Sequence, residues 1–147
     1  MMALFNPSRD QVRQFFFDAW AKYRNRSALS ELEALALGVM QMHAEYHHVL
    51  NAPERYLEQA YFPEMGETNP FLHMSLHLSI LEQIAIDQPP GIKDAYQSLQ
   101  LRIQDAHTAQ HELMECLAET LWQAQRMQSA PDTETYLALI RQKAAVD

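Results

Sequence analysis

Residues 69–86 read NPFLHMSLHLSILEQIAI, and this stretch decides the fold that we expect. Asn69 followed by Pro70 is typical of a helix start, with a capping side chain and then proline in the first turn. The residues that follow are apolar nearly all the way round a helix, which is typical of a helix buried on every side. His73 and His77 interrupt this apolar surface one turn apart. A buried helix needs other helices around it, so the stretch predicts a helical protein.

The rest of the chain also has the composition of a helical protein. Glycine occurs only three times in 147 residues, and the periodic segments are rich in residues that favour helices. The length suits a single domain over residues 1–147. We therefore expect an all-α, up-down helical bundle of four to five main helices with a short connector helix. The expected main helices cover about 6–24, 29–50, 70–86, 92–127 and 131–143, and the connector helix covers about 53–61.

Two of these helices carry start signals at their first residues. Asn6 and Pro7 repeat the pattern of a capping side chain followed by proline. Ser30 and Glu33 have the spacing of a capping box, in which each side chain bonds to the backbone N–H of the other residue. Both signals support the predicted boundaries.

Six of the seven histidines form three pairs with identical spacing. Residues four apart on a helix project from the same face about one turn apart, where two imidazoles can bind one ion. Random placement of seven histidines predicts about a third of one such pair. The three pairs are His43 and His47, His73 and His77, and His107 and His111.

The three pairs are predicted to meet at one end of the bundle. Helices joined by short connections run antiparallel, so residue counts from each turn give the level of each pair. By this count His107 lies about as far from the break at 88–91 as His73 does on the other side. The connector at 51–69 crosses the same end. Further candidates near that level are Asp10, Tyr61 and Glu64.

This set of side chains points to a transition metal. Neutral imidazole suits zinc, iron, copper and nickel rather than magnesium or calcium. Glu115 lies one turn beyond His111 and would act as a terminal or bridging carboxylate. Six imidazoles and a carboxylate exceed a tetrahedral structural zinc site, so we expect one or two ions, with iron favoured and zinc next. Iron would bind O2, NO or peroxide, as a sensor or small oxidase, and zinc would activate water for hydrolysis with Glu115 or another carboxylate as base.

The alternative is a metal-free module for protein–protein interaction. In that interpretation the histidines are structural or pH-responsive, and the methionine-rich and aromatic surface binds another protein, with a homo-oligomer as one form. A metal-free cluster of imidazoles is costly, because each ring needs a partner and protonated rings repel one another.

Charge and hydropathy exclude other partners. The net charge of −8 disfavours a nucleic acid, and no apolar run is long enough to span a membrane. Cys116 is the only cysteine, and the start MMALFNPSRD does not have the features of an export signal. We therefore expect a cytoplasmic protein.

Four segments resemble a bacterial family known as domain-of-unknown-function family 1841, over nearly the whole chain. They are HAEYH at 43–47, NPFLHMSLH at 69–77, HTAQHELMEC at 107–116 and LWQAQR at 121–126. This resemblance implies no activity. In architecture the chain is also similar to hemerythrin-type bundles, in which histidines and carboxylates from several helices hold two irons that bind oxygen. Of the hemerythrin carboxylate spacings, only His111 to Glu115 is matched.

Overall fold

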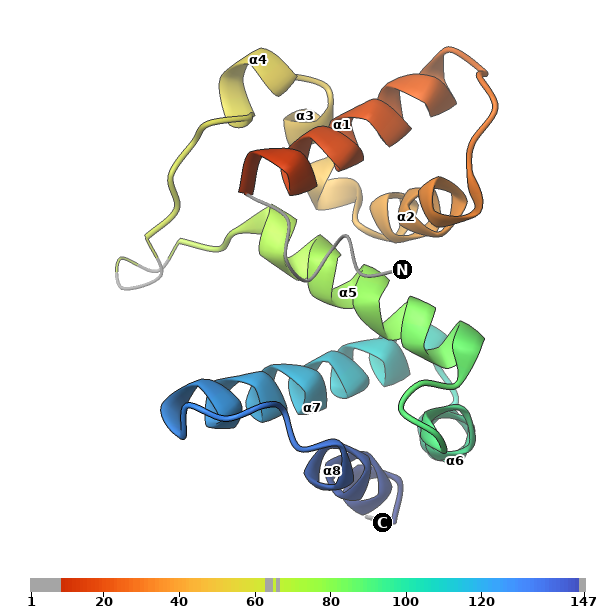
Figure 1. Cartoon of the computed structure of the whole chain (residues 1–147). Helices are drawn as coiled ribbons and strands as arrows, with labels where there is room; N and C mark the ends of the chain where they lie inside the picture. Colours follow the sequence, from red (N-terminus) through yellow and green to blue (C-terminus); the bar gives the residue numbers. More distant parts are fainter. Residues whose placement is uncertain (1–8, 63–64, 66, 146–147) are drawn as a thin grey trace. The chain divides into compact units, whose positions relative to one another are not determined.

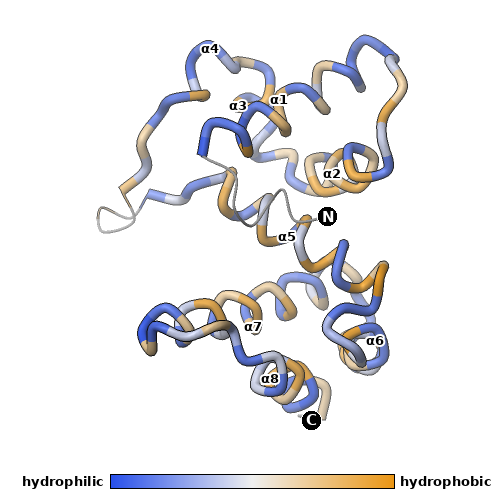
Figure 2. The backbone as a smooth tube through the Cα atoms, viewed as in Figure 1, coloured by the Kyte–Doolittle hydropathy of each residue, from blue (hydrophilic) through white to orange (hydrophobic). Residues whose placement is uncertain are grey.

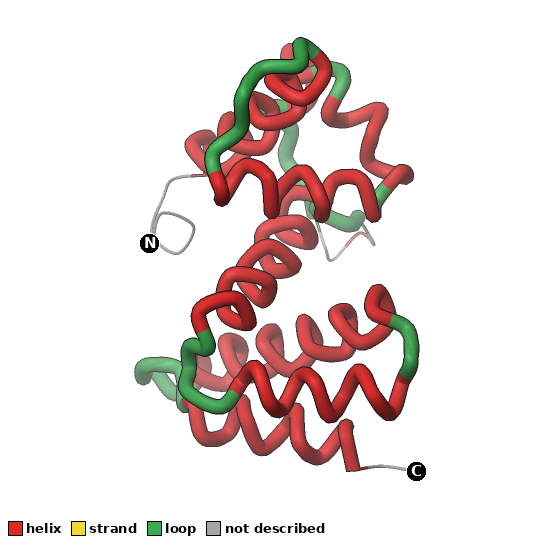
Figure 3. Tube along the Cα trace, turned by 90° about the vertical axis from the view of Figure 1, so that its right-hand side faces the viewer, coloured by secondary structure: helices red, strands yellow, loops and turns green. Residues whose placement is uncertain are grey.

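The structure is a computed structural model that describes residues 9–62, 65 and 67–145 (Figure 1). Over these residues the chain forms eight α-helices and a 3-10 helix, with no strand, joined by loops (Figure 3). The expected all-helical class is therefore confirmed. The predicted start at Asn6 and Pro7 lies outside the described residues. The helices are α1 (Arg9–Arg24), α2 (Glu31–Met42), η1 (Ala44–Tyr46), α3 (His47–Leu50), α4 (Pro53–Tyr56), α5 (Pro70–Ile86), α6 (Ile92–Ile103), α7 (Ala106–Arg126) and α8 (Thr133–Ala145).

The contacts divide the chain into two compact units, Met1–Leu78 and Ser79–Asp147. The division falls inside α5, which has the bounds that the sequence predicts. Its first half belongs to the first unit and its second half to the second unit. Each unit is described separately below.

The first unit is built around the packing of α1 on α2. Phe16, Ala36, Val39 and Met40 are fully buried between these helices and their neighbours. The predicted capping box is present, because Ser30 Oγ accepts from Glu33 N and Glu33 Oε1 accepts from Ser30 N. The other carboxylate oxygen of Glu33 pairs with Lys22 of α1 at 2.8 Å. One side chain therefore both starts α2 and fixes it to α1.

The predicted continuous helix over 29–50 is wrong, since α2 ends at Met42. In a continuous helix the carbonyl of Met40 would accept from the N–H of Ala44. Here that carbonyl accepts from His43 N at 3.2 Å and from His47 Nε2 at 2.8 Å. This side-chain bond competes with the helical one, and the chain continues through η1 into the separate helix α3.

Arg13 fixes the segment that follows α4. This side chain is only 2% exposed, and its Nη1 donates to the carbonyl oxygens of Tyr56, Leu57 and Gln59 at 3.1, 3.1 and 2.7 Å. Its guanidinium also lies 4.7 Å from the ring centre of Phe71 on α5. A buried arginine thus joins α1, the end of α4 and the start of α5.

The second unit contains α6, α7 and α8, which pack on one another. Hydrophobic and hydrophilic stretches alternate along α7, as expected of an amphipathic helix (Figure 2). The predicted single helix over 92–127 is wrong, because Gln104 ends α6 in the left-handed conformation with φ of 63°. Asp105 then caps α7 by accepting from Thr108 N at 2.9 Å. The residue count that placed His107 assumed one continuous helix, so it does not hold.

Candidate metal site

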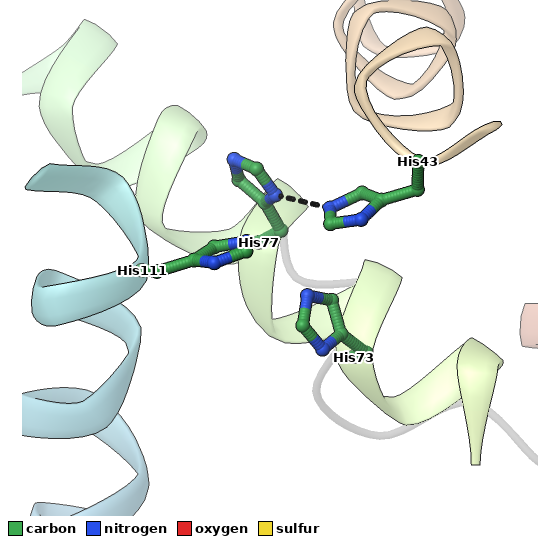
Figure 4. A group of neighbouring side chains, drawn as sticks. All are labelled: His43, His73, His77 and His111. Carbon is green, nitrogen blue, oxygen red and sulfur yellow. Dashed lines mark hydrogen bonds between the residues drawn. The ribbon is translucent and has the colours of Figure 1, made fainter. Parts of the chain in front are cut away.

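Three histidines of the first unit form a cluster (Figure 4). His43 follows the last residue of α2, and His73 and His77 lie one turn apart in the first half of α5. His43 Nε2 lies 3.1 Å from His77 Nδ1, although the two residues are 34 positions apart in the sequence. The ring centres of His43 and His73 are 4.6 Å apart. One ring nitrogen from each histidine lies within 4.8 Å of the others, which is a spacing that one ion can bridge.

The cluster is largely shielded from water. His43 and His77 are fully buried, and His73 is half-buried. Tyr46 of η1 stacks on His43 with ring centres 5.4 Å apart, and its ring edge contacts His73 at 5.8 Å. Burial raises the pKa of Tyr46, so its phenol stays neutral. The 3-10 turn that ends α2 therefore supplies one wall of the cluster.

Glu45 sets the orientation of His43. Its Oε2 lies 3.0 Å from His43 Nδ1, and a carboxylate can only accept, so Nδ1 carries the proton and Nε2 presents a lone pair to His77. Partial burial raises the pKa of Glu45, but the hydrogen bond from His43, a backbone hydrogen bond and the charges of His43 and His73 together outweigh burial, and the pKa lies below its ordinary value. A histidine that donates one ring nitrogen to a carboxylate and presents the other is the usual arrangement of a metal ligand.

The spacing of the His43 and His77 nitrogens also fits coordination. Two nitrogens bound at about 2.0–2.1 Å from one ion are separated by about 2.8–3.4 Å at octahedral or tetrahedral angles. The observed 3.1 Å lies within this range. An ion bound by both rings would take the place of the proton that His77 donates to His43.

His47 does not join this cluster. Its Nε2 donates to the carbonyl of Met40, and its ring lies 4.7 Å from that of Trp20 on α1. The prediction paired His43 with His47 because they are four residues apart, but that spacing brings side chains together only on a continuous helix. The 3-10 turn between them separates the two rings.

In the second unit, His107 and His111 face one another on α7. Their Nε2 atoms are 3.1 Å apart, and both side chains are half-buried. The third predicted member of this face, Glu115, is exposed and pairs with Lys143 of α8 at 3.1 Å. Figure 4 also draws His111, which lies on α7 of the second unit.

The weaker candidates from the sequence lie elsewhere. Asp10 is exposed and pairs with Arg9 at 3.4 Å. Tyr61 lies beside Arg13, with the guanidinium 5.5 Å from its ring centre, and burial raises its pKa. Glu64 lies outside the described residues. The sequence analysis did not select Glu45 or Tyr46, because their positions relative to His43 depend on a 3-10 turn that no spacing rule indicated.

The chain belongs to the family described as domain of unknown function (DUF1841), whose pattern matches residues 8–142. It has no detectable similarity to a curated protein or to a solved structure. The hemerythrin-like resemblance therefore gains no support and stays a prediction. Within the described residues no helix is long and apolar enough to cross a membrane.

Proposed function

We propose that this DUF1841 protein binds a transition-metal ion through His43, His73 and His77. The observation that carries the proposal is the arrangement around His43. Its Nδ1 is held by Glu45 at 3.0 Å, while its Nε2 faces His77 Nδ1 at 3.1 Å in a buried site. Burying three imidazoles is costly unless each ring is satisfied, and a metal ion satisfies three at once.

Three protein ligands leave at least one coordination position open. Structural zinc sites use four protein ligands, whereas sites with three bind water or a small ligand at the remaining position. The ion would therefore serve in small-ligand binding or catalysis. Iron, which the sequence analysis favours, would bind O2, NO or peroxide, and zinc would acidify a bound water. Tyr46, stacked on His43, covers one side of the cluster.

Metal analysis of the untagged protein tests the proposal. We expect His73→Asn combined with His77→Gln to lower the bound transition metal by about one equivalent, because three ligands are reduced to one. His48→Asn is the matched control, since His48 is exposed and its ring edge contacts Tyr56 instead of the cluster. Circular dichroism verifies that each variant is folded.

The outcome that contradicts the proposal is a wild-type metal content unaffected by the double substitution. A content below about 0.2 equivalents after gentle purification, with no recovery on adding Fe2+ or Zn2+, would also contradict it. If metal is present, absorption spectroscopy distinguishes the two ions, because zinc has no visible bands.

One observation favours the metal-free alternative as a second candidate. The bond from His77 Nδ1 to His43 Nε2 and the bond from His43 Nδ1 to Glu45 satisfy both nitrogens of His43 without an ion. In that case the cluster is a structural polar core. Substitution of His77 would then lower stability, and added metal would not change the midpoint of thermal unfolding of the wild type.

A further inference from the structure

The second unit carries a histidine pair that the proposed site does not use. His107 and His111 lie in the first two turns of α7, where Asp105 caps the helix. Their rings are edge to face with centres 4.3 Å apart, and both present Nε2 to the same point, 3.1 Å from one another. This separation lies within the range given above for two nitrogens bound to one ion.

The pair lies in a surface hollow with an acidic lining. The hollow has a volume of about 370 Å3 and is lined by Asp105, His107, Thr108, His111, Glu112 and Glu115.

The carboxylates around the hollow outnumber the cationic side chains near them. Lys143 contacts both Glu112 and Glu115, and the charge of Arg102 also acts on Glu112, so three carboxylates meet two cationic side chains. The surplus negative charge raises the local concentration of cations. The histidine pair supplies the nitrogen donors that select a transition-metal ion from among them.

We infer that His107 and His111, on α7 of the second unit, form a second binding site for a divalent transition-metal ion. The two imidazoles chelate the ion, and water fills the remaining positions. The site has fewer protein ligands than the first and is only half-buried, so its affinity is lower. Glu115 lies one turn further along α7 and becomes available as a third ligand when its ion pair with Lys143 opens.

The test is a calorimetric titration of the whole, metal-free chain with Zn2+. It is carried out on the wild type and on two double variants. We expect the wild type to bind two equivalents of Zn2+, one with high affinity (the tight class) and one with lower affinity (the weaker class). His107→Asn with His111→Asn should remove only the weaker class, and His73→Asn with His77→Gln should remove only the tight class. His48→Asn, as the matched control, should keep both.

The outcomes distinguish the inference from the proposed function. If the wild type binds a single equivalent and only the His73 and His77 variant loses it, the second site is overturned and the first stands. If the wild type binds a single equivalent and only the His107 and His111 variant loses it, the first site is overturned and the second is supported. If the wild type binds a single equivalent and both variants lose it, one ion needs both sets of histidines, and the second site is overturned.

A further variant tests the role of the hollow rather than the pair alone. Lys143→Met removes the cation that competes for Glu112 and Glu115, so the weaker class should tighten about two- to fivefold, as expected from the loss of a partly exposed ion pair. The tight class should not change. Unchanged or weaker Zn2+ binding in the weaker class would overturn the proposed part of Glu115.

Discussion

Replacing Glu45 tests whether the cluster of the first unit is organised for metal binding. The carboxylate accepts from His43 Nδ1 at 3.0 Å, so Nε2 carries the lone pair that would coordinate an ion. Partners of this kind typically contribute 10- to 100-fold to metal affinity. The Glu45 side chain is 61% exposed, so water screens its charge and the effect should fall at the lower end. We predict that Glu45→Ala weakens metal binding about tenfold, or about 1.4 kcal/mol.

Glu45→Gln separates the two contributions of this side chain. Its amide oxygen still accepts from His43 Nδ1, so the orientation is kept and only the charge is lost, and binding should weaken by less than about threefold. Competition with a chromophoric chelator measures both affinities. Glu54→Ala is the matched control, because Glu54 is an exposed glutamate on α4. If Glu45→Ala binds metal as tightly as Glu54→Ala, the proposed role of Glu45 is refuted.

Three further predictions concern the stability of the fold, each measured by urea unfolding followed by circular dichroism. Glu33→Gln should cost about 1 kcal/mol at pH 7. The bonds from Lys22 and Ser30 hold the pKa of Glu33 below its ordinary 4.5, so this stabilisation is complete above that pH and the difference from wild type should vanish as the pH falls below the folded-state pKa. Arg13→Met should cost about 3 kcal/mol, because three part-buried carbonyls lose a charged, buried donor, whereas the exposed Arg55→Met should cost little. Gln104→Gly should stabilise by about 1 kcal/mol by relieving the positive φ, and Gln100→Gly inside α6 should destabilise by a similar amount. A cost of Glu33→Gln that does not shrink as the pH falls below 4.5, an Arg13→Met cost equal to that of Arg55→Met, or a destabilising Gln104→Gly would each contradict the corresponding argument.

The sequence was most informative where one signal extended over many residues. The long apolar pattern from Phe71 to Ile86 predicted α5 with its observed bounds, and the capping box at Ser30 and Glu33 predicted the start of α2. It failed at two breaks that contain neither glycine nor proline. At Met40 a side chain competes for a backbone carbonyl, and at Gln104 a non-glycine residue adopts a left-handed conformation. Both depend on local contacts that a periodic pattern does not encode.

The candidate site shows the same division. His73 and His77 lie on a continuous helix, so their spacing correctly predicted that they reach one cluster. His43 and His47 have the identical spacing but are separated by η1. Glu45 contacts His43 from two positions along the chain, a relation that is absent from a regular helix. Spacing alone therefore predicted the histidines on α5 and α7 but not the carboxylate that orients His43.

The contact between His43 and His77 also bears on the entropy of the chain. It joins positions 34 residues apart, and an ion held by both would act as a reversible cross-link that closes this loop. Closing a loop of that length removes about 3–4 kcal/mol of conformational entropy from an unfolded chain that keeps the ion. Phe62 and Met65, inside the loop, are 46% and 76% exposed and offer cleavage sites to a protease. Cleavage there should slow when metal is bound, so limited proteolysis would report occupancy even of an ion without a visible spectrum.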